Sequence, residues 1–97
     1  MADNSYVDMG ILRDTATQLK TAATELTTLS GTLGTAGGDV SNGWSDDNSA
    51  KFAQRFGEFS EATGKLIAEI SNYASFLEDS AGKYEAAQQS ALSSLGG

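Results

Sequence analysis

The sequence predicts an all-α protein built as an antiparallel helical hairpin, with its single Trp in the turn. Two observations carry this prediction. The 97 residues contain no Pro, the residue that breaks helices most strongly, so long uninterrupted helices are allowed. In both halves of the chain apolar positions recur every three or four residues, the spacing of one helix face, and no alternating run typical of a strand competes with them.

The first helix is expected over about residues 9–38. Asp8 precedes it as an N-cap, because a short acceptor side chain can bond a free N–H of the first turn. The face that packs against the second helix is spaced 3, 4, 3, 4 and 3, and consists of Met9, Leu12, Ala16, Leu19, Ala23 and Leu26. Glycines blur the far end, since each costs roughly 1 kcal/mol relative to Ala inside a helix; these are Gly31, Gly34, Gly37 and Gly38.

The turn is expected at about residues 39–46, where turn formers and short polar side chains cluster from Ser41 to Asn48. One of Ser45, Asp46 or Asp47 should cap the second helix. That helix is expected over about residues 47–92, with a frayed tail at 93–97, and the chain 1–97 forms a single domain. Because the second helix is much the longer, its end from about Gly82 should overshoot the first.

The second helix carries a seam of apolar residues that begins with Phe52, Phe56 and Phe59 and continues through Thr63, Leu66, Ile70, Tyr73 and Leu77. On both helices the apolar stripe is wider, roughly 120° to 160° of arc, than a two-helix hairpin can cover. We therefore expect a dimer, most simply a four-helix bundle. The expected dimer face contains Ile11, Leu29 and Leu33, with Phe76 either a partner contact at the edge of the bundle or a single exposed aromatic.

Composition argues against catalysis. The chain has no His and no Cys, so the commonest general base, the thiol nucleophile and the preferred zinc ligands are missing. With no phosphate loop and no facing pair of carboxylates, no catalytic residue, cofactor site or metal site is expected. A net charge of −7 argues against nucleic acid and anionic membranes as partners.

Targeting signals are also missing from the sequence. No apolar stretch approaches the ~18 residues of a membrane span, so direct membrane insertion is not expected. The first residues lack the basic and apolar regions of a cleaved signal peptide. By these rules alone the chain would be cytoplasmic.

Trp44 is the single Trp and lies in the turn rather than on a helical seam. It can plug the end of the hairpin, because a Trp side chain buries a large area. It can also be displayed as an anchor for another protein, since Trp is enriched at binding hot spots. The two roles are compatible, because one face of the ring can be buried while its edge stays accessible.

A Trp near the midpoint, followed by Phe52, Phe56 and Phe59 on the second helix, resembles the WXG-motif family over the whole chain. These are the ESAT-like small proteins exported by type VII secretion systems of Gram-positive bacteria and mycobacteria. The family's Trp-x-Gly corresponds to Trp44-Ser45-Asp46, in which Asp replaces Gly but tolerates a tight turn and can cap a helix. The family's export signal, a Tyr followed four residues later by an acidic residue, corresponds most closely to Tyr84 and Gln88.

The resemblance implies a non-enzymatic small secreted protein, exported without a cleaved signal peptide after a cytoplasmic stage. It would act as a homodimer, or as a heterodimer with a related helical protein, that the secretion ATPase recognises. In a head-to-tail dimer Trp44 of one chain would lie near Tyr84 of the other. The alternative is an adaptor or chaperone that pairs with a larger secreted toxin or effector and targets it for export. The neutral Gln88 and the absence of Gly at position 46 favour this second hypothesis.

Overall fold

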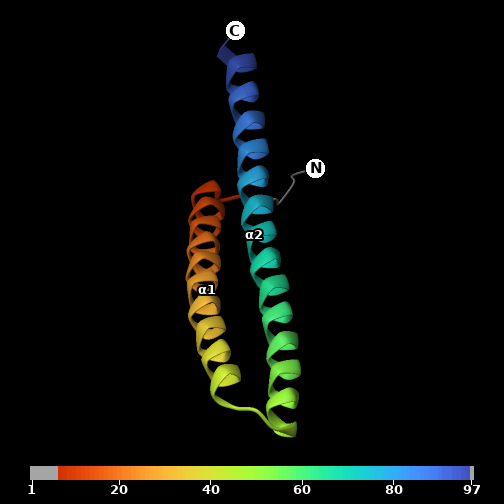
Figure 1. Cartoon of the computed structure of the whole chain (residues 1–97). Helices are drawn as coiled ribbons and strands as arrows, with labels where there is room; N and C mark the ends of the chain where they lie inside the picture. The colour runs from red at the N-terminus through yellow and green to blue at the C-terminus, as the bar shows by residue number, and fades with distance from the viewer. Residues whose placement is uncertain (1–6, 97) are drawn as a thin grey trace.

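The computed structural model describes residues 7–96 and confirms the all-α hairpin (Figure 1). Helix α1 spans Met9–Gly43 and helix α2 spans Asp47–Gly96. The two lie antiparallel with three residues between them, and α2 continues well past the start of α1. The molecule is therefore a rod, 76 Å long and only 24 by 15 Å across.

Both helices begin where the sequence predicts. The Asp8 side chain accepts a hydrogen bond from the Ile11 N–H at 3.0 Å, which satisfies one of the free donors of the first turn of α1. At the second start, Asp46 is the residue that caps α2: its carboxylate accepts from the Ser49 N–H at 3.0 Å. The other two candidates, Ser45 and Asp47, do not take this role.

The predicted end of the first helix at residue 38 is wrong, because α1 continues through the glycines to Gly43 and the turn shrinks from 39–46 to 44–46. Glycine ends a helix when it adopts a positive φ, and within residues 7–96 no glycine does so. Gly37 is moreover buried beneath the Phe56 ring. This tertiary contact holds helical a stretch that local propensity alone leaves weak.

The frayed tail predicted at 93–97 is also wrong for its described part, since α2 runs to Gly96, while Gly97 lies outside the described residues. The last contact with α1 is the ion pair of Glu85 with Arg13, and beyond it α2 continues as the predicted overhang, which begins a few residues later than Gly82. Leu92 and Leu95 on this overhang are exposed.

Small residues hold the two helices together. The fully or almost fully buried apolar side chains are all alanines: Ala16, Ala23, Ala74 and Ala81. Two ion pairs between the helices fix their alignment, Arg13 with Glu85 at 3.0 Å and Lys20 with Glu78 at 2.6 Å. This alignment places Ala16 level with Ala81 and Ala23 level with Ala74, to within one residue. Alanine against alanine lets the two helices approach closely.

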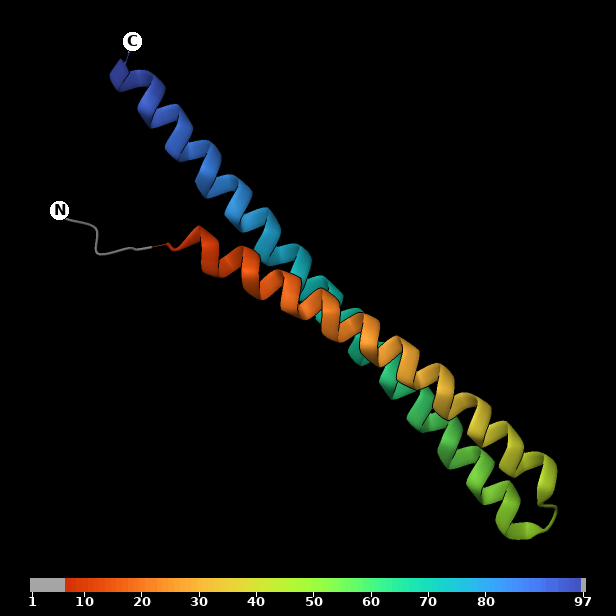
Figure 2. The same cartoon turned by 90° about the vertical axis from the view of Figure 1, so that its left-hand side faces the viewer.

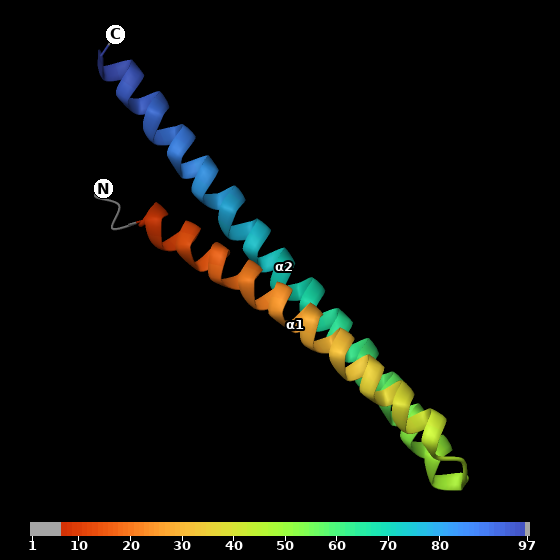
Figure 3. The same ribbon diagram turned by 60° about the vertical axis from the view of Figure 1, so that its left-hand side comes forward.

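The seam of α2 differs from the predicted one in its second half. Leu66 and Tyr73 were expected to pack against the first helix, but they are 48% and 62% exposed. The inward positions are instead Thr63, Ile67, Ile70, Ala74, Leu77 and Ala81, all buried or half-buried and spaced 4, 3, 4, 3 and 4. Figures 2 and 3 show that α1 and α2 cross at a shallow angle. A straight helix drifts by about 20° over seven residues relative to a strict seven-residue repeat, so the contacting positions of α2 move by one residue along its length.

Two features at the surface complete the fold. Glu61 and Lys65 form an ion pair one turn apart at 3.3 Å, with both side chains more than two-thirds exposed. None of the described helices combines the length and the apolar character that crossing a membrane requires.

The contact between Gly37 and Phe56 yields a prediction with a built-in control. A Cβ at Gly37 would lie 2.7 Å from Cε1 of Phe56, whereas a Cβ at Gly34 meets nothing within 4 Å. Both changes to Ala gain helix propensity, so Gly34→Ala should raise the free energy of unfolding by about 0.5–1 kcal/mol. Gly37→Ala should lower it by about 1 kcal/mol, because overpacking of about 1–3 kcal/mol outweighs the gain. Thermal unfolding followed by circular dichroism checks both, and equal stabilisation by the two variants would contradict the packing role of Gly37.

Candidate interaction sites: the Trp turn and an uncovered apolar face

The turn between the helices is built by reciprocal hydrogen bonds. The Asp46 carboxylate accepts from the Ser49 N–H, and the Ser49 hydroxyl oxygen accepts from the Asp46 N–H at 2.9 Å. This is the arrangement of a capping box, in which the cap and the third residue of the helix satisfy each other's free donors. The turn therefore has a defined shape at the point where α2 begins.

The Asp46 carboxylate is stabilised in its ionised form. The Trp44 side chain contributes most, followed by hydrogen bonds from the backbone N–H groups of Ser49 and Asn48, and together they lower the pKa of Asp46 from its ordinary 3.8. Burial acts in the opposite direction and is outweighed by these hydrogen bonds. A negative charge here also complements the positive end of the α2 dipole.

Trp44 is both anchored and displayed. Its ring centroid lies 6.2 Å from that of Phe52, and a row of tilted aromatic contacts continues from Phe52 to Phe56 at 5.6 Å and from Phe56 to Phe59 at 5.8 Å. Phe52 and Phe56 are half-buried, whereas Phe59 is 48% exposed. Trp44 keeps 39% of its surface exposed. The row fixes the Trp ring on one side and leaves the other side accessible.

These features match a known family along most of the chain. The WXG100 family, described as proteins of 100 residues with WXG, matches residues 6–89. The chain belongs to the WXG100 family. It is accordingly an ESAT-like small secreted protein of the type VII pathway, whose members typically form dimers with related helical proteins. No curated protein and no solved structure matches significantly.

The position at which this WXG100 protein departs from the motif has a structural explanation. Asp46 stands where the motif has Gly, and within residues 7–96 no residue, Gly included, has a positive φ. The turn thus does not use the conformation that only Gly adopts easily. Asp46 instead uses its side chain to cap α2, an interaction that Gly cannot make.

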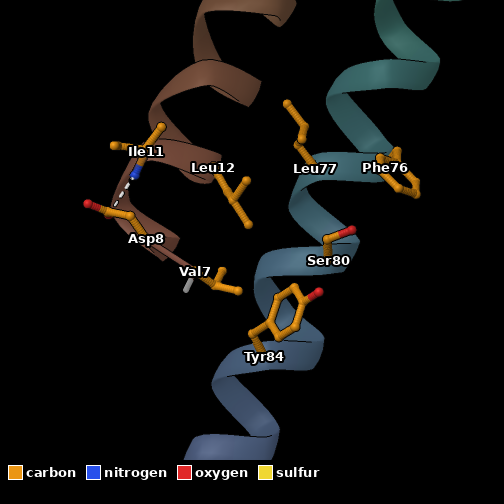
Figure 4. A pocket seen from close by; sticks show the side chains of 8 residues that line it. All are labelled: Val7, Asp8, Ile11, Leu12, Phe76, Leu77, Ser80 and Tyr84. Carbon is orange, nitrogen blue, oxygen red and sulfur yellow. Dashed lines mark hydrogen bonds between the residues drawn. The ribbon is translucent and has the colours of Figure 1, made fainter. Parts of the chain in front are cut away.

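The two residues of the export-signal resemblance lie where α2 leaves α1. Tyr84 is 50% exposed and lines a groove of about 460 Å³ between the start of α1 and α2. Figure 4 shows that Leu12, Leu77 and Val7 border this groove, and that Phe76 lies on the far side of α2. The remaining lining residues are Asp8, Ile11 and Ser80. Tyr84 therefore borders a groove rather than entering the helix–helix seam, and Gln88, four residues on, is exposed on the overhang.

Several large apolar residues along both helices are exposed, and in a helical projection they fall on the same side of the seam formed by the buried alanines. We call this the apolar face; its exposed large residues are Ile11, Leu29, Val40, Phe59, Leu66, Tyr73 and Tyr84. Phe76 lies at its edge and is 67% exposed. Leu33, which was expected on the dimer face, is half-buried and therefore exposes only part of its side chain there.

Two features near the turn, the Gly37–Phe56 contact and the capping box, were not predicted from the sequence. Gly37 was treated only as a weak point of the helix, although it receives the Phe56 ring. The capping box was not recognised, although its signal is present as Asp46 followed three residues later by Ser49. Among residues 7–96 no group of His, Cys, Asp or Glu side chains is arranged to hold a metal ion.

The capping box predicts how the turn responds to substitution and pH. Asp46→Ala removes the cap and should lower the melting temperature by a few degrees at pH 7, whereas Asp46→Gly, the residue of the family motif, should lower it less, because Gly is an acceptable N-cap. Because the folded-state pKa of Asp46 is depressed, its electrostatic contribution is present above the ordinary value near 3.8 and is lost as pH falls through the folded-state value.

Melting curves of wild type and Asp46→Asn between pH 7 and pH 2 isolate this charge. Asn keeps a capping side chain but carries no charge, so the wild type should melt higher at neutral pH and the difference should vanish at low pH. A difference that stays constant over the whole range would show that the Asp46 charge has no part in it.

Proposed function

We propose that this WXG100 protein acts as a dimer that the type VII secretion ATPase recognises and exports. The observation that carries the proposal is the apolar face, since seven large apolar or aromatic residues along both helices are 39–62% exposed. Monomeric soluble proteins rarely leave so extended an apolar surface uncovered. Two hairpins that share such faces make a four-helix bundle, the simplest arrangement that covers them.

Recognition is assigned to the two places where an aromatic ring is held yet accessible. Trp44 rests on Phe52 and keeps part of its surface free at the tip of the hairpin. Tyr84 borders the groove at the other end, next to the overhang. In a head-to-tail dimer the tip of one chain reaches the groove of the other, so Trp44 and Tyr84 from different chains would form one composite surface for the ATPase.

The adaptor role is the second candidate, in which the chain pairs with a larger secreted effector and targets it for export. The neutral Gln88 favours this role, since a chain with a weakened signal of its own can take the missing charge from a partner. The two candidates differ in what covers the apolar face: a second copy in the first, and a helical segment of the effector in the second.

The mass of the purified chain in solution, measured by light scattering behind a sizing column, separates the two. A self-sufficient substrate should show about twice the chain mass of 10.1 kDa together with a cooperative melting curve. A monomer with low helicity or poor cooperativity would contradict the homodimer and favour the adaptor role.

Trp44→Phe tests recognition at the tip. Phe retains much of the apolar volume against Phe52, so helicity, melting and dimer mass should be nearly unchanged while export falls severalfold. The matched control is Phe52→Leu, which disturbs the same aromatic cluster without changing the displayed ring. Export of Trp44→Phe at the wild-type level, or an equal loss in both variants, would reduce Trp44 to a packing residue.

A further inference from the structure

Phe76 is the most exposed aromatic side chain among residues 7–96, and none of the packing contacts described above uses it. It is 67% exposed. At about 100° per residue it lies roughly 160° around α2 from the fully buried Ala74, so it faces away from α1. A single exposed aromatic residue is ordinary on a protein surface. What surrounds Phe76, however, is not a random sample of that surface.

Phe76 forms one wall of a shallow hollow on the outward side of α2. We call this the outward hollow; it measures about 410 Å³ and is lined by Glu69, Asn72, Tyr73 and Phe76. All four side chains are exposed. The hollow therefore brings together two aromatic rings, one carboxylate and one amide within two turns of a single helix.

The outward hollow is separate from the surfaces assigned above. At about 100° per residue, Glu69, Asn72 and Phe76 lie roughly 140–160° from Ala74, on the side of α2 opposite α1. The leucine of the apolar face on the same helix, Leu66, lies only roughly 80° from Ala74. A chain that covers the apolar face thus leaves Glu69, Asn72 and Phe76 accessible, so the hollow is available in the hairpin alone and in any dimer.

The charge around the hollow is negative. Over residues 66–82 α2 carries three carboxylates and no cation. One of them, Glu78, pairs with Lys20 of α1. The other two, Glu69 and Asp79, lie one on each side of the Phe76 position along the helix and form no ion pair among the described residues.

The nearest cation on α2 does not neutralise the hollow. Lys65 lies one turn before Glu69, but its ammonium group pairs with Glu61 on the preceding turn at 3.3 Å. The chain as a whole carries a net charge of −7. Charge complementarity therefore favours a basic occupant of the outward hollow over an acidic or a purely apolar one.

We infer that the outward hollow is a docking site for a basic segment of another protein, and that it receives an Arg side chain of that segment. This site is additional to the proposed dimer and to the recognition assigned to Trp44 and Tyr84, and it does not depend on either. It gives the chain a surface for a further partner on the side of α2 that both of those leave free.

A guanidinium group matches each wall of the hollow. It is planar and stacks on aromatic rings, here those of Phe76 and Tyr73. Its N–H groups donate hydrogen bonds, and the Glu69 carboxylate and the Asn72 side-chain oxygen accept them. The ammonium group of Lys is compact and strongly hydrated and does not stack as a plane. The site should therefore prefer Arg to Lys.

Peptide titration followed by NMR tests this preference on the full-length isotope-labelled chain. The probe is a synthetic Ala- and Gln-rich helical peptide with three Arg residues on one face, and the matched control carries citrulline, the neutral analogue of Arg, at the same positions. Salt at about 0.15 M screens diffuse attraction between exposed charges. The Arg peptide should shift the signals of residues 69–76 saturably. The citrulline peptide should bind at least severalfold more weakly, and a Lys version should fall between the two.

Three variants locate the site. Phe76→Ala and Glu69→Gln should each weaken binding of the Arg peptide severalfold, because the first removes a ring and the second removes the charge of the hollow. Glu25→Gln is the matched control: it removes one exposed carboxylate from α1, where the residue forms no ion pair among the described residues, and it should leave binding unchanged. Circular dichroism should show wild-type helicity for all three, since each side chain is exposed.

Several results would overturn the inference. Equal binding of the Arg and citrulline peptides would show that the hollow does not select a cation. An equal loss in Glu69→Gln and Glu25→Gln, or no loss in Phe76→Ala, would reduce binding to diffuse charge attraction. Larger shifts of the same signals with a neutral oligosaccharide, maltohexaose, would identify a sugar site instead.

Solution mass separates this inference from the proposed dimer. Phe76→Ala should retain the mass of the wild type, whether that is one chain or two. A Phe76→Ala variant that loses a dimer formed by the wild type would assign Phe76 to the chain–chain contact and overturn the docking site. A monomeric wild type that binds the Arg peptide at residues 69–76 would uphold the docking site, although the homodimer would have failed.

Discussion

The structure depends on one packing constraint: two long helices held against each other by small residues cannot enclose a core. Within residues 7–96 no large side chain is fully buried, and the most buried apolar positions are four alanines arranged in two facing layers. Alanine layers bring the helices close, but they leave the larger side chains of both helices on the flanks. The ion pairs beside these layers are about half-exposed, so each contributes ~0–1 kcal/mol and serves chiefly to fix the alignment. The wide apolar face is the direct consequence.

At the tip of the hairpin the chain reverses direction without Pro and without any residue, among those described, in the left-handed backbone conformation. A three-residue connection with reciprocal hydrogen bonds between Asp46 and Ser49 accomplishes this. The same connection places Trp44 against Phe52 at the head of an aromatic row. Asp46, which replaces the Gly of the family motif, therefore stabilises the turn by capping α2. Trp44 is thus both packed and exposed, because the contact with Phe52 that holds its ring leaves part of the ring accessible to solvent.

Much of this fold follows from the sequence, because the features that determine it are local. Helical periodicity, the absence of Pro and the capping side chains at Asp8 and Asp46 predict both helices and both of their starts. The far end of α1 could not be predicted, because the contact between Gly37 and Phe56 joins residues nineteen positions apart and overrides the low propensity of glycine. The inward face of α2 was misassigned at Leu66 and Tyr73, because a strict seven-residue repeat does not hold along a straight helix, which drifts by about 20° over seven residues and so moves the seam by one residue. Trp44 and the width of the apolar stripes were visible in the sequence, whereas the groove beside Tyr84 depends on how the helices meet.

Folding and assembly are coupled in this account, since a hairpin with so little buried surface gains much of its stability from whatever covers the apolar face. The most direct test is thermal unfolding followed by circular dichroism over about a hundredfold range of chain concentration. When the folded state is a dimer, its melting temperature rises with concentration, because assembly shifts the equilibrium by mass action. We expect such a rise. A fully helical chain whose melting temperature does not change with concentration would show that the hairpin is stable alone, and would contradict it.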